Sequence, residues 1–188
     1  FEVLTAPGYD DDALAVLKSK KNRILIKQKA KAEQTVQFKS LLNGVLAQDV
    51  DNRAEGKAEF KVVTTKAPTD AEIDDLTFAV IAVKHLKSNG IALVKNKQLI
   101  GSNCGQTSRV DALQNAIRKA KEFGFDLTGA VMASDAFFPF PDCVQISNEA
   151  GITAISQPGG SIKDQDSIDA ANANNQAMVV TGVRHFKH

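Results

Sequence analysis

The sequence predicts a layered α/β/α fold with a mostly parallel mixed sheet. From residue 90 onward, short apolar runs typical of buried strands alternate with segments that repeat apolar residues at helical spacing. Strands and helices that alternate in this way form sheets with parallel pairings, covered by helices on both faces. In addition, 43% of the 188 residues are hydrophobic, which is enough apolar material for a sizeable core.

The first third of the chain is predicted to contain strands and one helix. The strands are expected at 1–7, 23–27, 35–42, 44–50 and 60–65. The helix at 9–22 begins with aspartates and ends with lysines, an order that the helix dipole favours. Asn43 and Gly44 form a common hairpin signal, so the strands on either side of them are expected to pair. Residues 51–59 are highly charged and indicate a surface loop.

Two capped helices are predicted in the rest of the chain. Thr69 and Glu72 form a capping box, and the second half of the helix that they begin is apolar all round, so we expect it to be buried. Ser108 and Asp111 cap the other helix, which Gly124 ends. The remaining strands are expected at 91–94, 98–101, 129–134, 152–157 and 177–181, and further helices at 142–150 and 165–175.

Composition and charge exclude several classes of function. The formal net charge is +1, which offers no electrostatic attraction for nucleic acid or an anionic membrane. No apolar run approaches the roughly 18 residues of a spanning helix. The chain has 2 cysteines, without disulfide or metal spacing, which fits a reducing, cytoplasmic location. The H-x-E and P-C-x-x-C signature of zinc deaminases is absent, so no zinc is expected. Because the first residue is Phe1, we expect the chain to be a piece of a longer protein.

Two groups have a catalytic and a simpler interpretation. Lys84 and His85 form a Lys-His pair, but the simpler interpretation, which we favour, is that the helix surface becomes polar there. Cys104 could be a nucleophile, yet no histidine is near it in sequence, and a small buried thiol is the favoured interpretation.

Three unusual loops are expected at the carboxyl ends of strands, where sheets of this kind bind ligands. They lie at 102–109, 134–142 and 158–161. Polar and glycine-rich loops at helix starts can bind anions through free backbone N–H groups. The alternative is that Ser108 only caps its helix and the glycines only turn the chain.

The loop at 134–142 reads SDAFFPFPD and contains three phenylalanines and two prolines. Prolines keep the rings out of a regular helix or strand, so the rings could form a slot for a flat ligand. Asp142 could then accept hydrogen bonds from an amino-substituted heterocycle. The alternative is a hydrophobic plug over the end of the sheet.

Long motifs extend over nearly the whole chain. They read APGYDDDALAVLKSKKN, SNGIALVKNKQLIGSNCGQTSRVD, SDAFFPFPD, QPGGSIKD and TGVRHFKH. In this order they closely resemble the AICAR transformylase/IMP cyclohydrolase family of bifunctional purine biosynthesis enzymes. The resemblance places residues 1–188 in the C-terminal part of the transformylase. It implies a cytidine-deaminase-like second lobe at 34–188, preceded at 1–33 by the closing β-α-β segment of the first lobe.

The resemblance implies a formyltransferase that moves a formyl group from 10-formyltetrahydrofolate to AICAR, a purine nucleotide precursor, in a homodimer. It implies AICAR contacts from Asn89, Arg109, the backbone around Phe137, and Arg184, the last at the 5′-phosphate. It implies a folate site bordered by Pro139, Phe140, Asp142, Gly159, Gly160 and Ser161. A monovalent cation, potassium, is implied near Ser88 and Asp135. An arginine directly after the last strand suits a phosphate, and Asp142 suits the N–H donors of a pterin.

The chain also departs from the family pattern. The catalytic Lys-His pair of the family lies in a KH-x-NP stretch that is not in this sequence, so no catalytic residue is assigned and the chain alone is expected to be inactive. Cys143 stands where a polar residue near the folate is expected. A binding module for a nucleotide or folate, without catalysis, is the alternative function.

Overall fold

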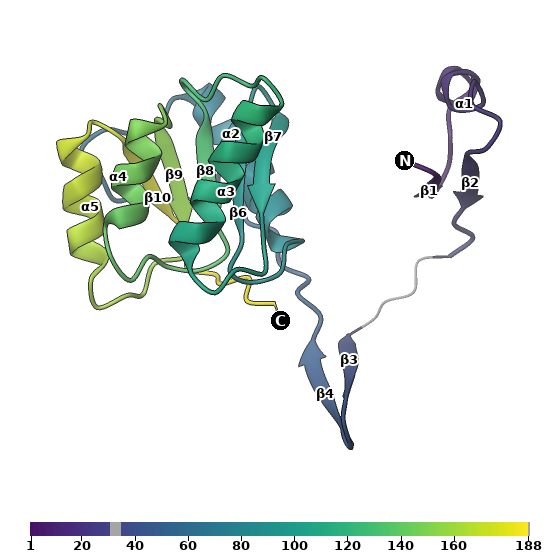
Figure 1. Ribbon diagram of the computed structural model, residues 1–188, viewed down its shortest axis with the longest axis horizontal. Helices are drawn as coiled ribbons and strands as arrows, with labels where there is room; N and C mark the ends of the chain where they lie inside the picture. The colour runs from purple at the N-terminus through teal and green to yellow at the C-terminus, as the bar shows by residue number, and fades with distance from the viewer. Residues whose placement is uncertain (31–34, 188) are drawn as a thin grey trace. The chain divides into compact units, whose positions relative to one another are not determined.

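The computed structural model describes residues 1–30 and 35–187 and divides into two compact units, Phe1–Val50 and Asp51–His188 (Figure 1). The division falls after Val50, so the predicted hairpin is part of the first unit. The predicted boundary between the two lobes after residue 33 stays a prediction, as does the closing of a preceding lobe by residues 1–33.

The first unit consists of regular elements without a buried core. Its elements are β1 (Val3–Ala6), α1 (Asp11–Leu17), β2 (Ile24–Lys27), β3 (Val36–Leu41) and β4 (Gly44–Asp49). β1 and β2 pair in parallel, and β3 and β4 form the predicted antiparallel hairpin, in which Leu41 lies opposite Gly44. The Tyr9 hydroxyl donates to the carbonyl of Leu4 at 2.8 Å and lies 3.0 Å from that of Ile26, which links the two parallel strands. None of the described residues of this unit is buried.

The second unit contains a mixed sheet in the order β5-β10-β9-β8-β6-β7. Its strands are β5 (Lys61–Val62), β6 (Ile91–Lys95), β7 (Gln98–Asn103), β8 (Val131–Ser134), β9 (Ala154–Gln157) and β10 (Ala177–Val180). β8, β9 and β10 are parallel, whereas β5, β6 and β7 pair antiparallel with their neighbours. The α/β class with a mixed sheet is confirmed, but parallel pairing is confined to its middle. At one edge, β6 and β7 are antiparallel because they join through a tight turn, which only an antiparallel pair allows.

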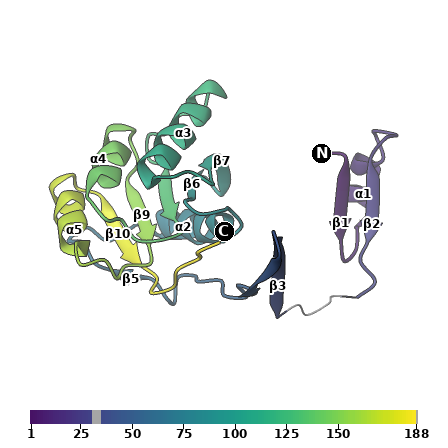
Figure 2. The same cartoon turned by 60° about the horizontal axis from the view of Figure 1, so that its bottom comes forward.

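Helices cover both faces of this sheet. They are α2 (Asp70–Lys84), α3 (Arg109–Glu122), α4 (Asp142–Glu149) and α5 (Asp164–Ala173). Figures 1 and 2 show α3, α4 and α5 on one face and α2 on the other. Because side chains alternate along a strand, each strand contributes to two clusters. Toward α2 the strands present small residues such as Ala92 and Ala133, and toward α3 to α5 they present larger ones such as Leu93 and Met132.

The predicted caps are confirmed. The Thr69 side chain accepts from the Glu72 backbone N–H at 3.2 Å, and the Glu72 carboxylate accepts from the Thr69 backbone N–H at 2.8 Å. The Ser108 hydroxyl accepts from the Asp111 N–H at 3.1 Å and begins α3.

Burial of the second half of α2 is only partly as expected. Leu76, Val80 and Val83 pack on the sheet, but Phe78 is 37% and Ile81 39% exposed. A helix that covers a sheet buries one stripe, and these two side chains lie on its opposite side.

Candidate functional site

The loops that the sequence singles out follow strands at the same edge of the sheet. Ile91, at the start of β6, pairs with Asn103 at the end of β7 and with Ser134 at the end of β8. β9 and β10 run parallel to β8, so the loop at 158–161 also begins at this edge. We call it the site edge: the segments 88–90, 103–109, 134–142, 158–161 and 181–187.

An arginine and a buried aspartate form an ion pair at the site edge. Nη2 of Arg109, at the start of α3, lies 3.0 Å from Oδ1 of Asp135, directly after β8, and the side chains are 11% and 0% exposed. Arg109 Nε and Asp135 Oδ2 are buried and have no hydrogen-bond partner within the described ranges. The pair therefore fixes the guanidinium while leaving donor and acceptor capacity unused.

Asn89 and Ser88 connect neighbouring segments of the site edge. The Asn89 side-chain amide donates to the carbonyl of Gln106 at 3.0 Å. The Ser88 hydroxyl accepts from the Lys187 backbone N–H at 2.9 Å, and the Ser88 N–H donates to the Lys187 carbonyl at 2.7 Å. Hydroxyl and carboxylate oxygens are ligands that suit a hard cation. Ser88 and Asp135 thus provide oxygens of the right kind, and Asp135 Oδ2 has no hydrogen-bond partner among the described residues. The cation itself stays a prediction.

The phenylalanine loop contains both a plug and an exposed ring. Phe138 is fully buried, and its backbone N–H donates to the Gln157 side-chain carbonyl at 3.1 Å. Phe137 is half-buried, Pro139 is exposed, and Phe140 is 51% exposed. The Nζ of Lys163 lies 4.5 Å from the centre of the Phe140 ring. The expectation of a slot built from all three rings is therefore wrong for Phe138, because this ring completes the core beneath the loop.

Asp142 and Cys143 begin α4 but differ in environment. Asp142 is half-buried in the first turn, and its carboxylate accepts from the Cys143 N–H at 2.8 Å. The Cys143 side chain is 1% exposed and packs in the core below α4. Burial, together with the negative charge of Asp142, raises the pKa of the Cys143 thiol to about 12. Cys143 therefore does not present its thiol to a ligand at the site edge.

The loop at 158–161 makes a tight turn into α5. Gly159 and Gly160 have φ of +74° and +98°, a conformation that glycine adopts without strain. The Gly160 N–H donates to the Asp164 carboxylate at 2.6 Å, and the Ser161 hydroxyl accepts from the Lys163 N–H at 3.1 Å. The simpler interpretation, a turn with a local cap, accounts for these bonds, and the Gly160 N–H is not free for an anion.

The structure also places Lys84, His85 and Cys104, while a catalytic role for any of them stays untested. Lys84 is the last residue of α2, and its ammonium donates to the Arg53 carbonyl, whereas His85 is exposed at the helix end. This agrees with a helix surface that becomes polar. Cys104 is exposed, so the expectation of a buried thiol is wrong; the buried cysteine is Cys143.

The C-terminal segment 181–187 crosses the site edge and brings in residues that the sequence analysis missed (Figure 2). Arg184 is exposed, and its guanidinium carbon lies 5.0 Å from the centre of the Phe186 ring. His185 is buried between the carboxylates of Asp51 and Glu55. Glu55 is 2% exposed, so the expectation of a surface loop at 51–59 is wrong for this residue. Alternation along the segment could have placed His185 on the inner side, but no local pattern indicated its carboxylate partners.

Comparison with known proteins adds a family and several relatives. The family model described as "AICARFT/IMPCHase bienzyme" matches residues 1–119. Over the whole chain, the sequence is 59% identical to the "Bifunctional purine biosynthesis protein PurH" of Bacteroides thetaiotaomicron and 52% identical to that of Chlorobium chlorochromatii. That of Aquifex aeolicus is 50% identical over 187 residues. The chain spans 37%, 36% and 36% of the length of these relatives, respectively.

The similar solved structures are deaminases. A dCMP deaminase from the cyanophage S-TIM5, in complex with dCMP and dUMP, is 18% identical with a TM-score of 0.42, over 59% of this chain and 98% of that one. A diaminohydroxyphosphoribosylaminopyrimidine deaminase/5-amino-6-(5-phosphoribosylamino)uracil reductase from Thermotoga maritima is 18% identical with a TM-score of 0.37, over 56% of this chain and 33% of that one. Similarities of this size carry no argument about activity. Among the helices of the described residues, none combines the length and apolar character needed to cross a membrane.

Proposed function

Because the chain belongs to the AICARFT/IMPCHase bienzyme family, we propose that it forms the substrate-binding part of an AICAR formyltransferase. The reaction transfers a formyl group from the cosubstrate 10-formyltetrahydrofolate to the amino group of AICAR, in purine biosynthesis. The catalytic base comes from a part of the enzyme outside this chain, since the chain has no KH-x-NP stretch. Potassium near Ser88 and Asp135, and assembly of the enzyme as a homodimer, are parts of the same proposal.

The ion pair between Arg109 and Asp135 is the observation that carries this proposal. A guanidinium is always charged and offers donors in a fixed plane, which suits the carbonyl oxygen of a carboxamide. Asp135 balances the positive charge of Arg109 and holds the plane of its guanidinium. A ligand would therefore meet a hydrogen-bond donor that is already in position. Asn89, whose segment is tied to the adjacent loop through Gln106, would lie beside it to contact the base.

Two exposed groups supply the ends of the proposed site. Arg184 is exposed at the site edge and would bind the 5′-phosphate by charge-assisted hydrogen bonds. Phe140, with Pro139 beside it, would provide an apolar surface for the flat pterin of the folate. Asp142 would accept from the pterin N–H donors, and the loop of Gly159, Gly160 and Ser161 would border the same ligand.

A chimera tests the proposal directly. In it, this chain replaces the matching segment of the Bacteroides thetaiotaomicron relative, to which it is 59% identical over its whole length. We expect the chimera to transfer formyl from 10-formyltetrahydrofolate to AICAR, and the isolated chain to show no turnover because general base catalysis, roughly 10²–10⁴-fold in rate, is missing.

Arg109 variants then test the carrying observation. Arg109→Lys keeps the charge but not the planar donors, so it should raise the KM for AICAR while the control Arg118→Lys, on the exposed side of α3, should not. If the chimera transfers no formyl group but the chain binds AICAR tightly, the results would instead support the alternative function, a binding module without catalysis.

A further inference from the structure

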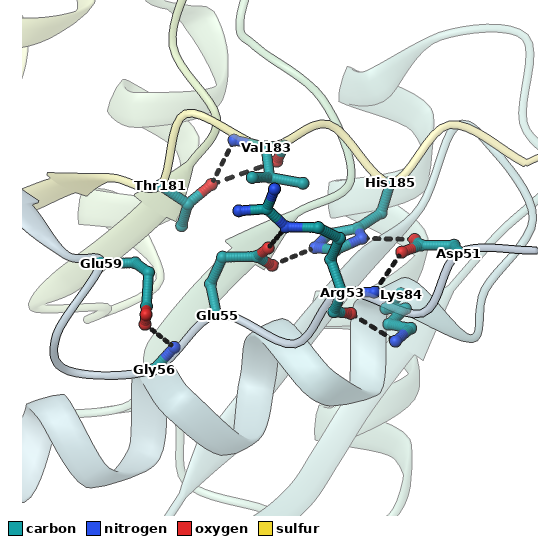
Figure 3. Close-up of polar contacts among 9 residues, drawn as sticks. All are labelled: Asp51, Arg53, Glu55, Gly56, Glu59, Lys84, Thr181, Val183 and His185. Atoms are coloured by element: carbon teal, nitrogen blue, oxygen red, sulfur yellow. Dashed lines mark hydrogen bonds and ion pairs between the residues drawn. The ribbon is translucent and has the colours of Figure 1, made fainter.

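A buried histidine lies between two carboxylates beside the site edge (Figure 3). The Nδ1 of His185 is 2.5 Å from Oδ2 of Asp51, and its Nε2 is 2.8 Å from Oε2 of Glu55. The His185 and Glu55 side chains are 3% and 1% exposed. Each ring nitrogen therefore faces a carboxylate oxygen, and the imidazole is held from both sides.

The carboxylates are themselves anchored (Figure 3). The Arg53 Nε lies 3.4 Å from Oε1 of Glu55, and the Arg53 backbone N–H donates to Oδ1 of Asp51 at 3.2 Å. The ammonium of Lys84, at the end of α2, donates to the Arg53 carbonyl. The segment 51–55 is thus tied to α2, and it gives His185 a fixed point of attachment.

The segment that carries His185 is tied to other segments of the site edge by backbone hydrogen bonds. The Gly182 N–H donates to the Pro158 carbonyl and the His185 N–H to the Asp135 carbonyl, each at 3.0 Å. Farther along, Lys187 exchanges hydrogen bonds with Ser88. The C-terminal segment therefore contacts three other segments of the site edge in turn, 158–161, 134–142 and 88–90.

Side chains alternate along this segment. Val183 and Lys187 are partly buried and His185 is buried, whereas Arg184 and Phe186 are exposed. Arg184 and His185 are adjacent and differ in burial, so holding His185 on the inner side also keeps Arg184 on the outer side.

We propose that His185 is a positioning residue for the nucleotide phosphate: its bonds to Glu55 and Asp51 set the register of the C-terminal segment and so hold Arg184 outward at the site edge. The inference rests on the proposed role of Arg184 as the phosphate ligand. His185 itself is too deeply buried to touch a substrate. Its contribution is to substrate binding, so a loss should raise KM for AICAR and leave kcat unchanged.

Two amide variants separate the bonds of His185. His185→Gln places an amide donor near the position of Nε2 and can retain the bond to buried Glu55. His185→Asn places the donor near Nδ1 and leaves Glu55 without its histidine. His85→Gln is the matched control, because His85 is exposed at the end of α2.

Steady-state kinetics on the chimera give the first measurement. We expect His185→Asn to raise the KM for AICAR about tenfold, as the loss of a hydrogen bond to a charged group predicts. His185→Gln should raise it less. The kcat and the KM for 10-formyltetrahydrofolate should stay at the parent values in both, and His85→Gln should change nothing. An unchanged KM for AICAR in His185→Asn would overturn the proposal.

Amide hydrogen exchange on the chain itself gives a second measurement that does not depend on the reaction. The N–H groups of His185 and Lys187 should exchange faster in His185→Asn and not in His85→Gln. Unchanged exchange in His185→Asn would overturn the proposal for His185, whether or not the chimera is active. A chimera that transfers no formyl group would by itself count only against the proposed function. If His185→Asn does not fold, Asp51→Asn replaces it. The Asp51 side chain is 37% exposed, so this variant loses one bond without leaving a fully buried charge, and it should show the same changes to a smaller degree.

Discussion

The inner and the outer residues of the site edge differ sharply although they are neighbours in the sequence. Phe138 is fully buried and Phe140 is half-exposed, and His185 is buried next to exposed Arg184. The inner residues complete the core or make buried hydrogen bonds, and the outer residues have their side chains in solvent. The difference indicates that inner residues determine stability and geometry, whereas outer residues are available for a ligand. Each of the following experiments tests one such contrast.

The largest contrast is expected between the two phenylalanines. Phe138→Ala removes a fully buried ring, which typically costs about 3–5 kcal/mol of unfolding free energy. Phe140→Ala removes an exposed ring and its contact with Lys163, which is worth about 0.5–1 kcal/mol. Denaturant unfolding of both variants measures the contrast. Equal losses of stability would show that the loop is a single packed unit.

The two cysteines provide a contrast that depends on pH. Burial raises the folded pKa of Cys143 from 9.0 to about 12, so the neutral thiol stabilises the fold. This contribution is fully present below pH 9 and is lost as the pH rises toward 12. Stability should therefore fall over this range, and Cys143→Ala should reduce the fall, although it leaves a small cavity.

Thiol alkylation provides the matched control. At pH 8, a thiol reagent should modify exposed Cys104 in the native protein and leave Cys143 unmodified until the protein unfolds. Mass spectrometry of the labelled peptides distinguishes the two. Rapid native labelling of Cys143 would contradict its place in the core.

The contrast between Arg184 and its neighbours concerns binding. In the chimera, Arg184→Ala should weaken AICAR binding by about 1.5–3 kcal/mol, because a charge-assisted hydrogen bond to the phosphate is lost. The melting temperature and the affinity for the folate should hardly move, since Arg184 is exposed. Titration calorimetry measures the binding of both ligands. Arg118→Ala, on the exposed side of α3, is the control. Equal AICAR affinity in Arg184→Ala and the parent would remove Arg184 from the site.

The smallest effect is expected at Asp142. Asp142→Ala should raise the KM for 10-formyltetrahydrofolate, because a site built around a hydrogen-bonding partner loses affinity without it. Its stability should change by less than about 1 kcal/mol, the usual contribution of an acidic residue in the first turn of a helix. Asp166→Ala, in the first turn of α5, removes a comparable charge from a residue that is not assigned to the folate and should leave the KM unchanged. Early unfolding with a normal KM would make Asp142 a structural cap.

Local patterns were sufficient for most elements of the fold. The capping box of Thr69 and Glu72, the cap at Ser108 and the hairpin around Asn43 all lie where the sequence predicts them. Such signals act between residues a few positions apart, so they need no knowledge of the rest of the chain. The strand order and the parallel or antiparallel direction of each pairing were harder to predict, because they depend on which strands, distant in sequence, form hydrogen bonds with each other.

The candidate site was predicted in part. The loops at 102–109, 134–142 and 158–161 were expected at strand ends, and the strand registers place them at the same edge. The ion pair of Arg109 with Asp135 and the cluster around His185 were not foreseen. Arg109 and Asp135 are 26 residues apart in sequence, and His185 is 130 residues from Glu55 and 134 from Asp51. No local pattern reports a pairing over such distances.

By itself, the sequence determined the helices and strands of this protein, the loops at their ends and, through its long motifs, the family. Only the tertiary structure decided which member of each pair is buried: Phe138 or Phe140, Cys143 or Cys104, His185 or Arg184. The physical reason is that secondary structure follows from local hydrogen bonding and side-chain periodicity, which a short segment contains. Burial depends on which distant surfaces pack together, and a short segment does not contain that information.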